Sequence, residues 1–230
     1  MRNNMLDNKR AALFDLDGTL VDSMWIWGAI DIDFLAAYGL DVPPGLQQTI
    51  EGMSFSEVAQ YFKERFALSQ STDEIKHEWI TMAEEKYRLE VPLKAGVIEV
   101  LPFLKSKNMK LAVASSNSMQ LVEKVLEAHA ITEYFDCILT SCEVPRGKPA
   151  PDVYLEAARR LQVAPEHCIV YEDIPSGLMA GNAARMQTCA VYDRHSQPQE
   201  AQIRRLASYY IHSFNEVISG QYEILGTDSI

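Results

Sequence analysis

Two aspartates separated by one residue follow a short apolar run near the start of the chain. Asp15 and Asp17 come after residues 11–14, Ala-Ala-Leu-Phe, and a Gly-Thr pair follows them. The apolar run is typical of a buried strand, and the glycine is typical of its end. Two carboxylates at such a place repel each other, and a divalent cation bound by oxygen is the simplest compensation. A carboxylate beside such a cation can also attack phosphorus and form an aspartyl phosphate. For this motif alone, a plain surface turn is the alternative.

Polar side chains also follow three later apolar runs. They are Ser115, Ser116 and Asn117 after the second run, Lys148 after the third, and Glu172 with Asp173 after the fourth. Taken singly, these could be a helix cap, a solvated lysine and a polar loop. Ligands of open α/β sheets, however, bind at the carboxyl ends of the strands. The four places together therefore predict a site for phosphoryl transfer, in which acids hold a cation while a hydroxyl and an ammonium hold the phosphate.

Short apolar runs alternate with amphipathic stretches over most of the chain. Strands are expected at residues 11–16, 110–115, 136–140, 168–172, 188–192 and 209–211, and helices between them at 97–107, 118–129 and 151–161. Several strands are apolar without alternation, as expected when both faces of a sheet are covered. The pattern predicts a three-layer α/β fold with a parallel sheet between helices.

Residues 23–91 interrupt this alternation, because they contain only helical patterns, at residues 25–38, 54–66 and 72–89. A connection of about 70 residues is far longer than the few residues that usually join a strand to a helix. We therefore expect a catalytic core of residues 1–22 and 92–230, with a small all-helical cap domain of residues 23–91 inserted after the first strand.

The composition excludes several classes of partner. Among 230 residues, 32 acids and 21 bases give a net charge of -11, which disfavours nucleic acid and anionic membranes as partners. No apolar run approaches the roughly 18 residues of a membrane span. Residues 1–9 lack the apolar region of a signal peptide, and the four cysteines form no CxxC pair. We expect reduced thiols, no zinc site, a cytoplasmic location and a monomer.

These motifs resemble those of the haloacid dehalogenase-like superfamily, within the group related to β-phosphoglucomutase. The resemblance covers nearly the whole chain. It rests on residues 15–23 (Asp-Leu-Asp-Gly-Thr-Leu-Val-Asp-Ser), Ser115, residues 147–152 (Gly-Lys-Pro-Ala-Pro-Asp), and Glu172 and Asp173 with Gly177. It implies a Rossmann-like core with a mobile helical cap, and an enzyme that uses Mg2+ and an aspartyl phosphate.

The resemblance also implies roles for the acidic residues. Asp15 is the nucleophile and a magnesium ligand. Asp17 is the general acid-base, and its backbone carbonyl binds magnesium. Asp173 is a direct magnesium ligand, and Glu172 supports the metal through water. The physics agrees, because Asp15 must be ionised to attack, whereas Asp17 must carry a proton to the leaving alkoxide and later take one from water. This second acid argues against dehalogenation.

For the phosphate, the resemblance implies that Ser115 and Lys148 hold the oxygens that are not transferred. Gly18 and Thr19 help through backbone or side-chain groups. Ser116 is the second choice of hydroxyl, since either serine can be aligned with the family's motif.

The cap residues favour a phosphatase over a mutase. In the mutase pattern, an arginine follows the glycine of a cap loop and a histidine lies on the first cap helix, whereas this chain has Phe55 and Trp27 there. An aromatic ring cannot replace the bidentate phosphate grip of a guanidinium. The cap also has twelve acids against five bases, which disfavours a second phosphate. Trp27, Met53 and Phe55 are expected to contact the leaving group, with packing inside the cap as the alternative.

The sequence thus predicts a magnesium-dependent phosphatase for a small phosphorylated metabolite, such as a sugar phosphate. A β-phosphoglucomutase-like phosphosugar mutase is the alternative. A phosphate-sensing module without catalysis fits less well, because such modules have no lid of about 70 residues after the first strand.

Overall fold

A seven-stranded sheet forms the centre of the computed structural model, which describes residues 4–225. The strands are β1 (Ala11–Phe14), β2 (Lys110–Ser115), β3 (Cys137–Thr140), β4 (Cys168–Glu172), β5 (Gln187–Val191), β6 (Tyr209–Ile211) and β7 (Glu223–Ile224). Their spatial order is β3-β2-β1-β4-β5-β6-β7, and all neighbours are parallel except β7, which pairs antiparallel with β6. The two strands that carry the predicted acids, β1 and β4, are therefore neighbours.

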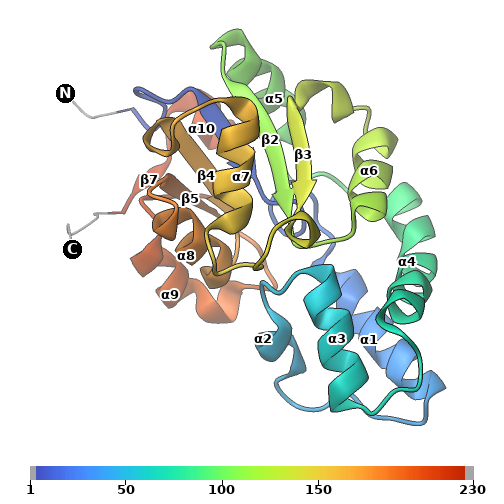
Figure 1. The fold of residues 1–230 in the computed structure, drawn as a ribbon. Coiled ribbons are helices and arrows are strands. Elements are labelled where there is room, and N and C mark those ends of the chain that lie inside the picture. Colours follow the sequence, from blue (N-terminus) through green and yellow to red (C-terminus); the bar gives the residue numbers. More distant parts are fainter. Residues whose placement is uncertain (1–3, 226–230) are drawn as a thin grey trace.

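Helices cover both faces of this sheet (Figure 1). One face holds α7 (Asp152–Leu161), α8 (Pro175–Ala183) and α9 (Glu200–Leu206); the other holds α5 (Val97–Ser106), α6 (Met119–Ala128) and α10 (Asn215–Ser219). In β1, Ala11 and Leu13 pack on the first face while Ala12 and Phe14 pack on the second, and all four are buried. Burial on both faces explains why these strands do not alternate. The predicted three-layer α/β fold is confirmed.

Only helices occur between β1 and α5 in the described chain. They are α1 (Met24–Ala37), α2 (Leu46–Ile50), α3 (Phe55–Arg65) and α4 (Thr72–Leu89). Both α3 and α4 begin with a capping box, whose serine and glutamate satisfy the free backbone N–H groups of the first turn. Phe34, Phe62 and Trp79 pack together with ring centroids 4.9–6.1 Å apart. The segment therefore has an aromatic core of its own, and Figure 1 shows it at the carboxyl ends of β2 and β3.

The chain leaves and re-enters the sheet region at adjacent points. Asp22 donates its backbone N–H to Pro92 (3.0 Å), and Val21 pairs with Leu93 in an isolated bridge. These contacts lie at the two boundaries predicted from the sequence. The division into a catalytic core and a cap domain stays a prediction.

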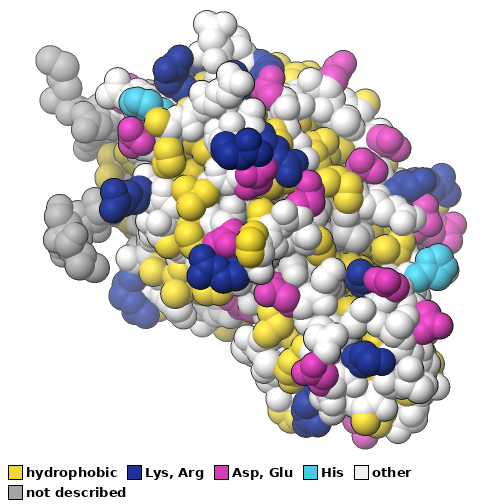
Figure 2. Space-filling view, in the orientation of Figure 1, with side chains coloured by type: hydrophobic (Ala, Val, Ile, Leu, Met, Phe, Trp, Pro, Cys, Tyr) yellow, Lys and Arg dark blue, Asp and Glu magenta, His cyan; other side chains and the backbone are white. Residues whose placement is uncertain are grey.

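The predicted ranges do not include α2, α8, α9, α10 and β7. Of these, α2 and β7 have only five and two residues, which are too few to set up a period. A helix able to span a bilayer is absent from residues 4–225. On the face drawn in Figure 2, acidic and basic side chains of the described residues are interspersed.

Candidate active site

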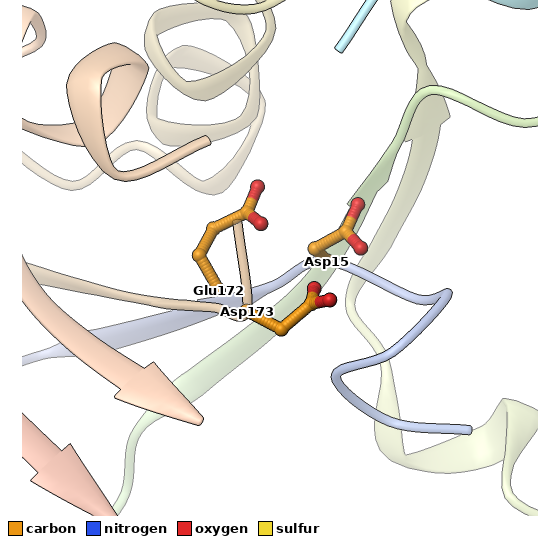
Figure 3. A group of neighbouring side chains, drawn as sticks. All are labelled: Asp15, Glu172 and Asp173. Atoms are coloured by element: carbon orange, nitrogen blue, oxygen red, sulfur yellow. The ribbon is translucent and has the colours of Figure 1, made fainter. Parts of the chain in front are cut away.

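Three carboxylates meet where β1 and β4 end. Asp15, Glu172 and Asp173 are buried, and each places one carboxylate oxygen within 4.8 Å of the others (Figure 3). The register explains this meeting: Phe14 pairs with Tyr171, and the backbone N–H of Asp15 donates to the carbonyl of Tyr171 (3.0 Å). The residues that follow must emerge side by side.

The donor set of this cluster fits a metal ion. Oε2 of Glu172 and Oδ2 of Asp173 are buried and have no hydrogen-bond partner within residues 4–225. Buried carboxylate oxygens without partners are costly, and hard divalent cations such as Mg2+ prefer oxygen ligands. The cluster could therefore hold a cation, as the sequence predicted.

Lys148 is the one ammonium group that bonds to this cluster within the described chain. Its Nζ lies 2.6 Å from Oδ1 of Asp15 and 2.6 Å from Oε1 of Glu172, and Tyr154 also donates its hydroxyl to Glu172. Burial raises the pKa of Glu172 to about 7 against the attraction of Lys148. Burial, and then Asp15 and Glu172, raise the pKa of Asp173 well above its usual range. Burial alone would lower the pKa of Lys148, but the two carboxylates raise it. One ammonium does not balance three buried carboxylates.

The loop after β1 holds Asp173 in place. Gly18 has a φ of +83°, and a Cβ at this position would meet Oδ2 of Asp173. Thr19 donates its hydroxyl to Oδ1 of Asp173 (3.0 Å), while the backbone N–H of Gly18 donates to Val21 (2.8 Å). These donors already have partners inside the chain. A direct contact of Gly18 or Thr19 with phosphate stays a prediction.

The Asp17 carboxylate lies outside the cluster and has different partners. Ser23 and Tyr87 donate their hydroxyls to its Oδ1, and Nδ2 of Asn117 donates to its Oδ2 (2.8 Å). Burial, and then the charge of Asp15, raise the pKa of Asp17. A carboxyl that retains its proton to higher pH suits a general acid. The two aspartates of the motif thus have separate environments, as their predicted roles require.

Tyr87 and Asn117 were missed as partners of Asp17. The Tyr87 hydroxyl also accepts hydrogen bonds from Nε1 of Trp27 (2.9 Å) and Nδ2 of Asn117 (3.0 Å). Asn117 was counted among the polar residues after the second apolar run, with a helix cap as the alternative, and no contact with Asp17 was predicted for it. Tyr87 occupies an apolar position in the pattern of α4. No local sequence signal distinguishes such a tyrosine from a residue of the cap's own core.

A cavity of about 290 Å³ lies between the helical segment and the carboxyl edge of the sheet. The predicted residues that line it are Asp15, Asp17, Trp27, Met53, Phe55, Ser115, Ser116 and Lys148. The rings of Trp27 and Phe55 lie 6.0 Å apart, centroid to centroid. Gly18, Thr19, Glu172 and Asp173 are not among the described residues of its wall. The structure therefore brings the predicted cap residues to the cavity that contains Asp15, and their contact with a substrate stays a prediction.

The two candidate serines make different contacts. Ser115 accepts the backbone N–H of Asn117 on its Oγ (3.0 Å), whereas Ser116 donates its hydroxyl to the carbonyl of Gly52 (3.3 Å). Ser115 is thus held by its own loop, and Ser116 connects the sheet edge to the helical segment. Both line the cavity.

Comparison with known proteins identifies the family to which this chain belongs. The family model described as haloacid dehalogenase-like hydrolase matches residues 12–191. The chain belongs to the haloacid dehalogenase-like hydrolase family. It is 32% identical over 184 residues to hexitol phosphatase B of Escherichia coli K12, covering 79% of this chain and 82% of that protein. It is also 32% identical over 180 residues to the phosphorylated carbohydrates phosphatase of Thermotoga maritima, covering 77% and 82%.

A solved structure gives the same fold. The crystal structure of β-phosphoglucomutase from Clostridium difficile matches with a TM-score of 0.74 and 23% identity, over 93% of this chain and 96% of that one. The predicted membership of this family of hydrolases, and the predicted relation to the β-phosphoglucomutase fold, are confirmed.

Proposed function

We propose that this haloacid dehalogenase-like hydrolase is a magnesium-dependent phosphatase that cleaves a small phosphorylated metabolite, a sugar phosphate or similar phosphomonoester. The observation that carries the proposal is the placement of Asp15 and Asp17. They line one cavity but have different partners, Lys148 for the first and hydroxyl and amide donors for the second. A cavity of about 290 Å³ is at the small end for ligand sites, which suits a metabolite.

The reaction follows from these two environments. Asp15 attacks phosphorus through a carboxylate oxygen and becomes an aspartyl phosphate, while Asp17 protonates the leaving alkoxide. Asp17 then takes a proton from water, which attacks the phosphorus and releases phosphate from Asp15. Lys148 stabilises the negative charge near Asp15.

Asp15 and Asp173, with Glu172 beside them and the backbone carbonyl of Asp17, would hold Mg2+. When bound, this ion would neutralise the charge on the phosphate oxygens and orient them. The unpartnered oxygens of Glu172 and Asp173 support this assignment.

Two observations favour a phosphatase over a phosphosugar mutase. Trp27 and Phe55 line the cavity, and no arginine does so among residues 4–225. A mutase must hold two phosphates in one substrate, and here Lys148 is the single lysine in the described cavity wall. A mutase would depend on a bisphosphate activator and release no net phosphate.

The cap assignment belongs to this proposal. Residues 23–91 close over a catalytic core of residues 1–22 and 92–230. The N–H of Phe55 donates to the carbonyl of Ser116 (2.8 Å), and Gln199 donates to Glu51 (2.6 Å), so the helical segment contacts the sheet region on two sides of the cavity. The proposal also includes a cytoplasmic location and a monomeric state. The four cysteines are free thiols, as in a reducing compartment.

The test is phosphate release from a panel of phosphomonoesters with and without Mg2+. Asp15→Asn keeps the side chain's shape but removes the nucleophile, so turnover should fall by roughly a thousandfold or more. Asp33→Asn makes the same change at an exposed position of α1 outside the motifs and should turn over like the wild type. Wild-type turnover by Asp15→Asn would exclude the covalent route.

A further inference from the structure

A polar wall of the cavity takes no part in the proposed reaction. It consists of Asp31 from α1, Gln47 from α2, Glu51 from the loop after α2, and Gln199 from the 3-10 turn before α9. None of these four side chains hydrogen-bonds to Asp15 or Asp17. Three come from the helical segment and one from the sheet region, so the wall is complete only where the two meet.

Two oxygens of this polar wall have no hydrogen-bond partner within residues 4–225. Asp31 is only 6% exposed and accepts a hydrogen bond from Gln47 on Oδ2, while its Oδ1 has no partner within residues 4–225. Gln199 donates its Nε2 to Glu51 (2.6 Å), and its Oε1 is buried with no partner in the described chain. Buried polar atoms are seldom left unsatisfied in folded proteins. Oε1 of Gln199 is such an atom and can only accept, so its missing partner is a donor. A hydroxyl, which can both donate and accept, suits this oxygen and also the Asp31 carboxyl in either protonation state.

The charge of the polar wall indicates whether the ligand group bound there is neutral or anionic. Asp31 and Glu51 are acids, and the single lysine of the described cavity wall, Lys148, is already paired with Asp15 and Glu172. A carboxylate or second phosphate placed here would face two acids, and the described wall has no lysine or arginine other than Lys148 to balance it; His195 is the one other basic side chain in that wall. Burial raises the pKa of Asp31 to about 7, so this carboxyl can accept or donate a hydrogen bond near neutral pH, and neither form attracts an anion.

We propose that the polar wall binds the hydroxyl groups of a neutral, polyhydroxylated leaving group and rejects phosphomonoesters that carry a second negative charge there. This inference rests on the proposed phosphatase function and narrows its substrate class. Asp31 and Glu51 become specificity-determining residues. The aromatic rings of Trp27 and Phe55 supply the apolar part of the same cavity, against which the C–H groups of a polyol can pack.

The experiment uses matched ligands that differ in one group. Sorbitol 6-phosphate and 6-phosphogluconate share a six-carbon chain, and glycerol 3-phosphate and 3-phosphoglycerate share a three-carbon chain. In each pair a CH2OH group is replaced by a carboxylate. Binding is measured by calorimetry in Mg2+ with the Asp15→Asn protein, which leaves the ligands intact. In at least one pair the neutral member should bind about tenfold tighter or more, because like charges are costly to bring together.

Replacing the two acids of the polar wall by amides tests whether they cause this binding preference. Adding Asp31→Asn and Glu51→Gln to the Asp15→Asn protein should bring the preference to within about twofold, since these amides keep the shape of the side chains but remove the charge. Adding Asp33→Asn instead neutralises an exposed acid on the same helix and should leave the preference unchanged.

Equal binding of both members in both pairs would overturn the inference, and so would a preference that survives the neutralised wall. Turnover separates this result from the proposed function. A binding preference without magnesium-dependent hydrolysis by the wild type supports the polar wall and refutes the phosphatase. Hydrolysis of both members with equal affinity refutes the polar wall alone.

Discussion

At the scale of single residues, the environment of Asp17 links the helical segment to the proposed chemistry. Its carboxylate accepts hydrogen bonds from Ser23, from Tyr87 of α4 and from Asn117 after β2. Tyr87 reaches this place from the far end of the insertion, with Trp27 and Asn117 donating to its oxygen. We infer that Tyr87 is a positioning residue, which orients the acid once the segment lies over the core.

The Tyr87 hydroxyl gives the first prediction. Tyr87→Phe removes one donor to Asp17 and the acceptor of Trp27 and Asn117, but it keeps the ring. A hydrogen bond to a charged group contributes about 1.5–3 kcal/mol, so kcat should fall roughly ten- to a hundredfold with little change in KM. Steady-state kinetics on a good phosphomonoester measure this split. Tyr61→Phe, in α3, is the matched control and should keep wild-type kcat. A Tyr87→Phe enzyme with raised KM and unchanged kcat would contradict the positioning role.

At the scale of elements, the site depends on how closely α8 packs against the end of β4. Gly177 lies in the first turn of α8, and a Cβ there would overlap the carboxylate of Glu172. That carboxylate is fully buried and ion-paired with Lys148, so it has no free space into which to move. The glycine of the sequence motif is therefore explained by the approach of a helix to an acid.

The second prediction follows from this close approach. Gly177→Ala should displace Glu172, destabilise the fold by about 1–3 kcal/mol as overpacking does, and reduce phosphatase activity by disturbing Lys148. Urea unfolding and phosphate release measure the two effects. Gly28→Ala is the matched control, since a Cβ on this glycine of α1 meets nothing within 4 Å. The control should be neutral or slightly stabilised, because alanine favours helices more than glycine does. A Gly177→Ala protein as stable and active as the wild type would refute the packing argument.

The elements also show what could be predicted from the sequence. Asp15 and Asp173 were found because both follow strongly apolar strands, and parallel strands bring their carboxyl ends to one edge of the sheet. Tyr87 and Gln199 could not be found in this way. Their hydrogen-bond partners come from segments far away in the chain, and neither residue stands beside a motif. Local patterns report which face of an element is buried, but not which distant element covers it.

At the scale of the whole molecule, the helical stretch between β1 and α5 was predictable from its sequence patterns, and its contacts with the sheet region were not. The carboxyl cluster joins β1 to β4 through groups of like charge, with Lys148 between Asp15 and Glu172. Folding must therefore bring three buried acids together against their repulsion. A bound divalent cation would relieve that repulsion only in the folded chain, so the metal should act as a stabiliser of the entire fold.

The third prediction is a magnesium-dependent rise in the melting temperature. At about a hundred times its Kd, a ligand that binds only the folded state adds about 2.7 kcal/mol, which corresponds to roughly 5–10 °C for a chain of this size.

The melting temperature of Asp173→Asn should change in opposite directions in EDTA and in Mg2+. In EDTA this variant should melt at the same temperature as the wild type or higher, because the cost of burying this acid beside Asp15 and Glu172 is gone. In Mg2+ it should melt lower, because a ligand is gone. Asp73→Asn, an exposed acid in α4, should follow the wild type in both buffers. If Mg2+ raised the melting temperature of Asp173→Asn as much as that of the wild type, the ion would bind elsewhere. The coupling of the cluster to the fold would then have to be abandoned.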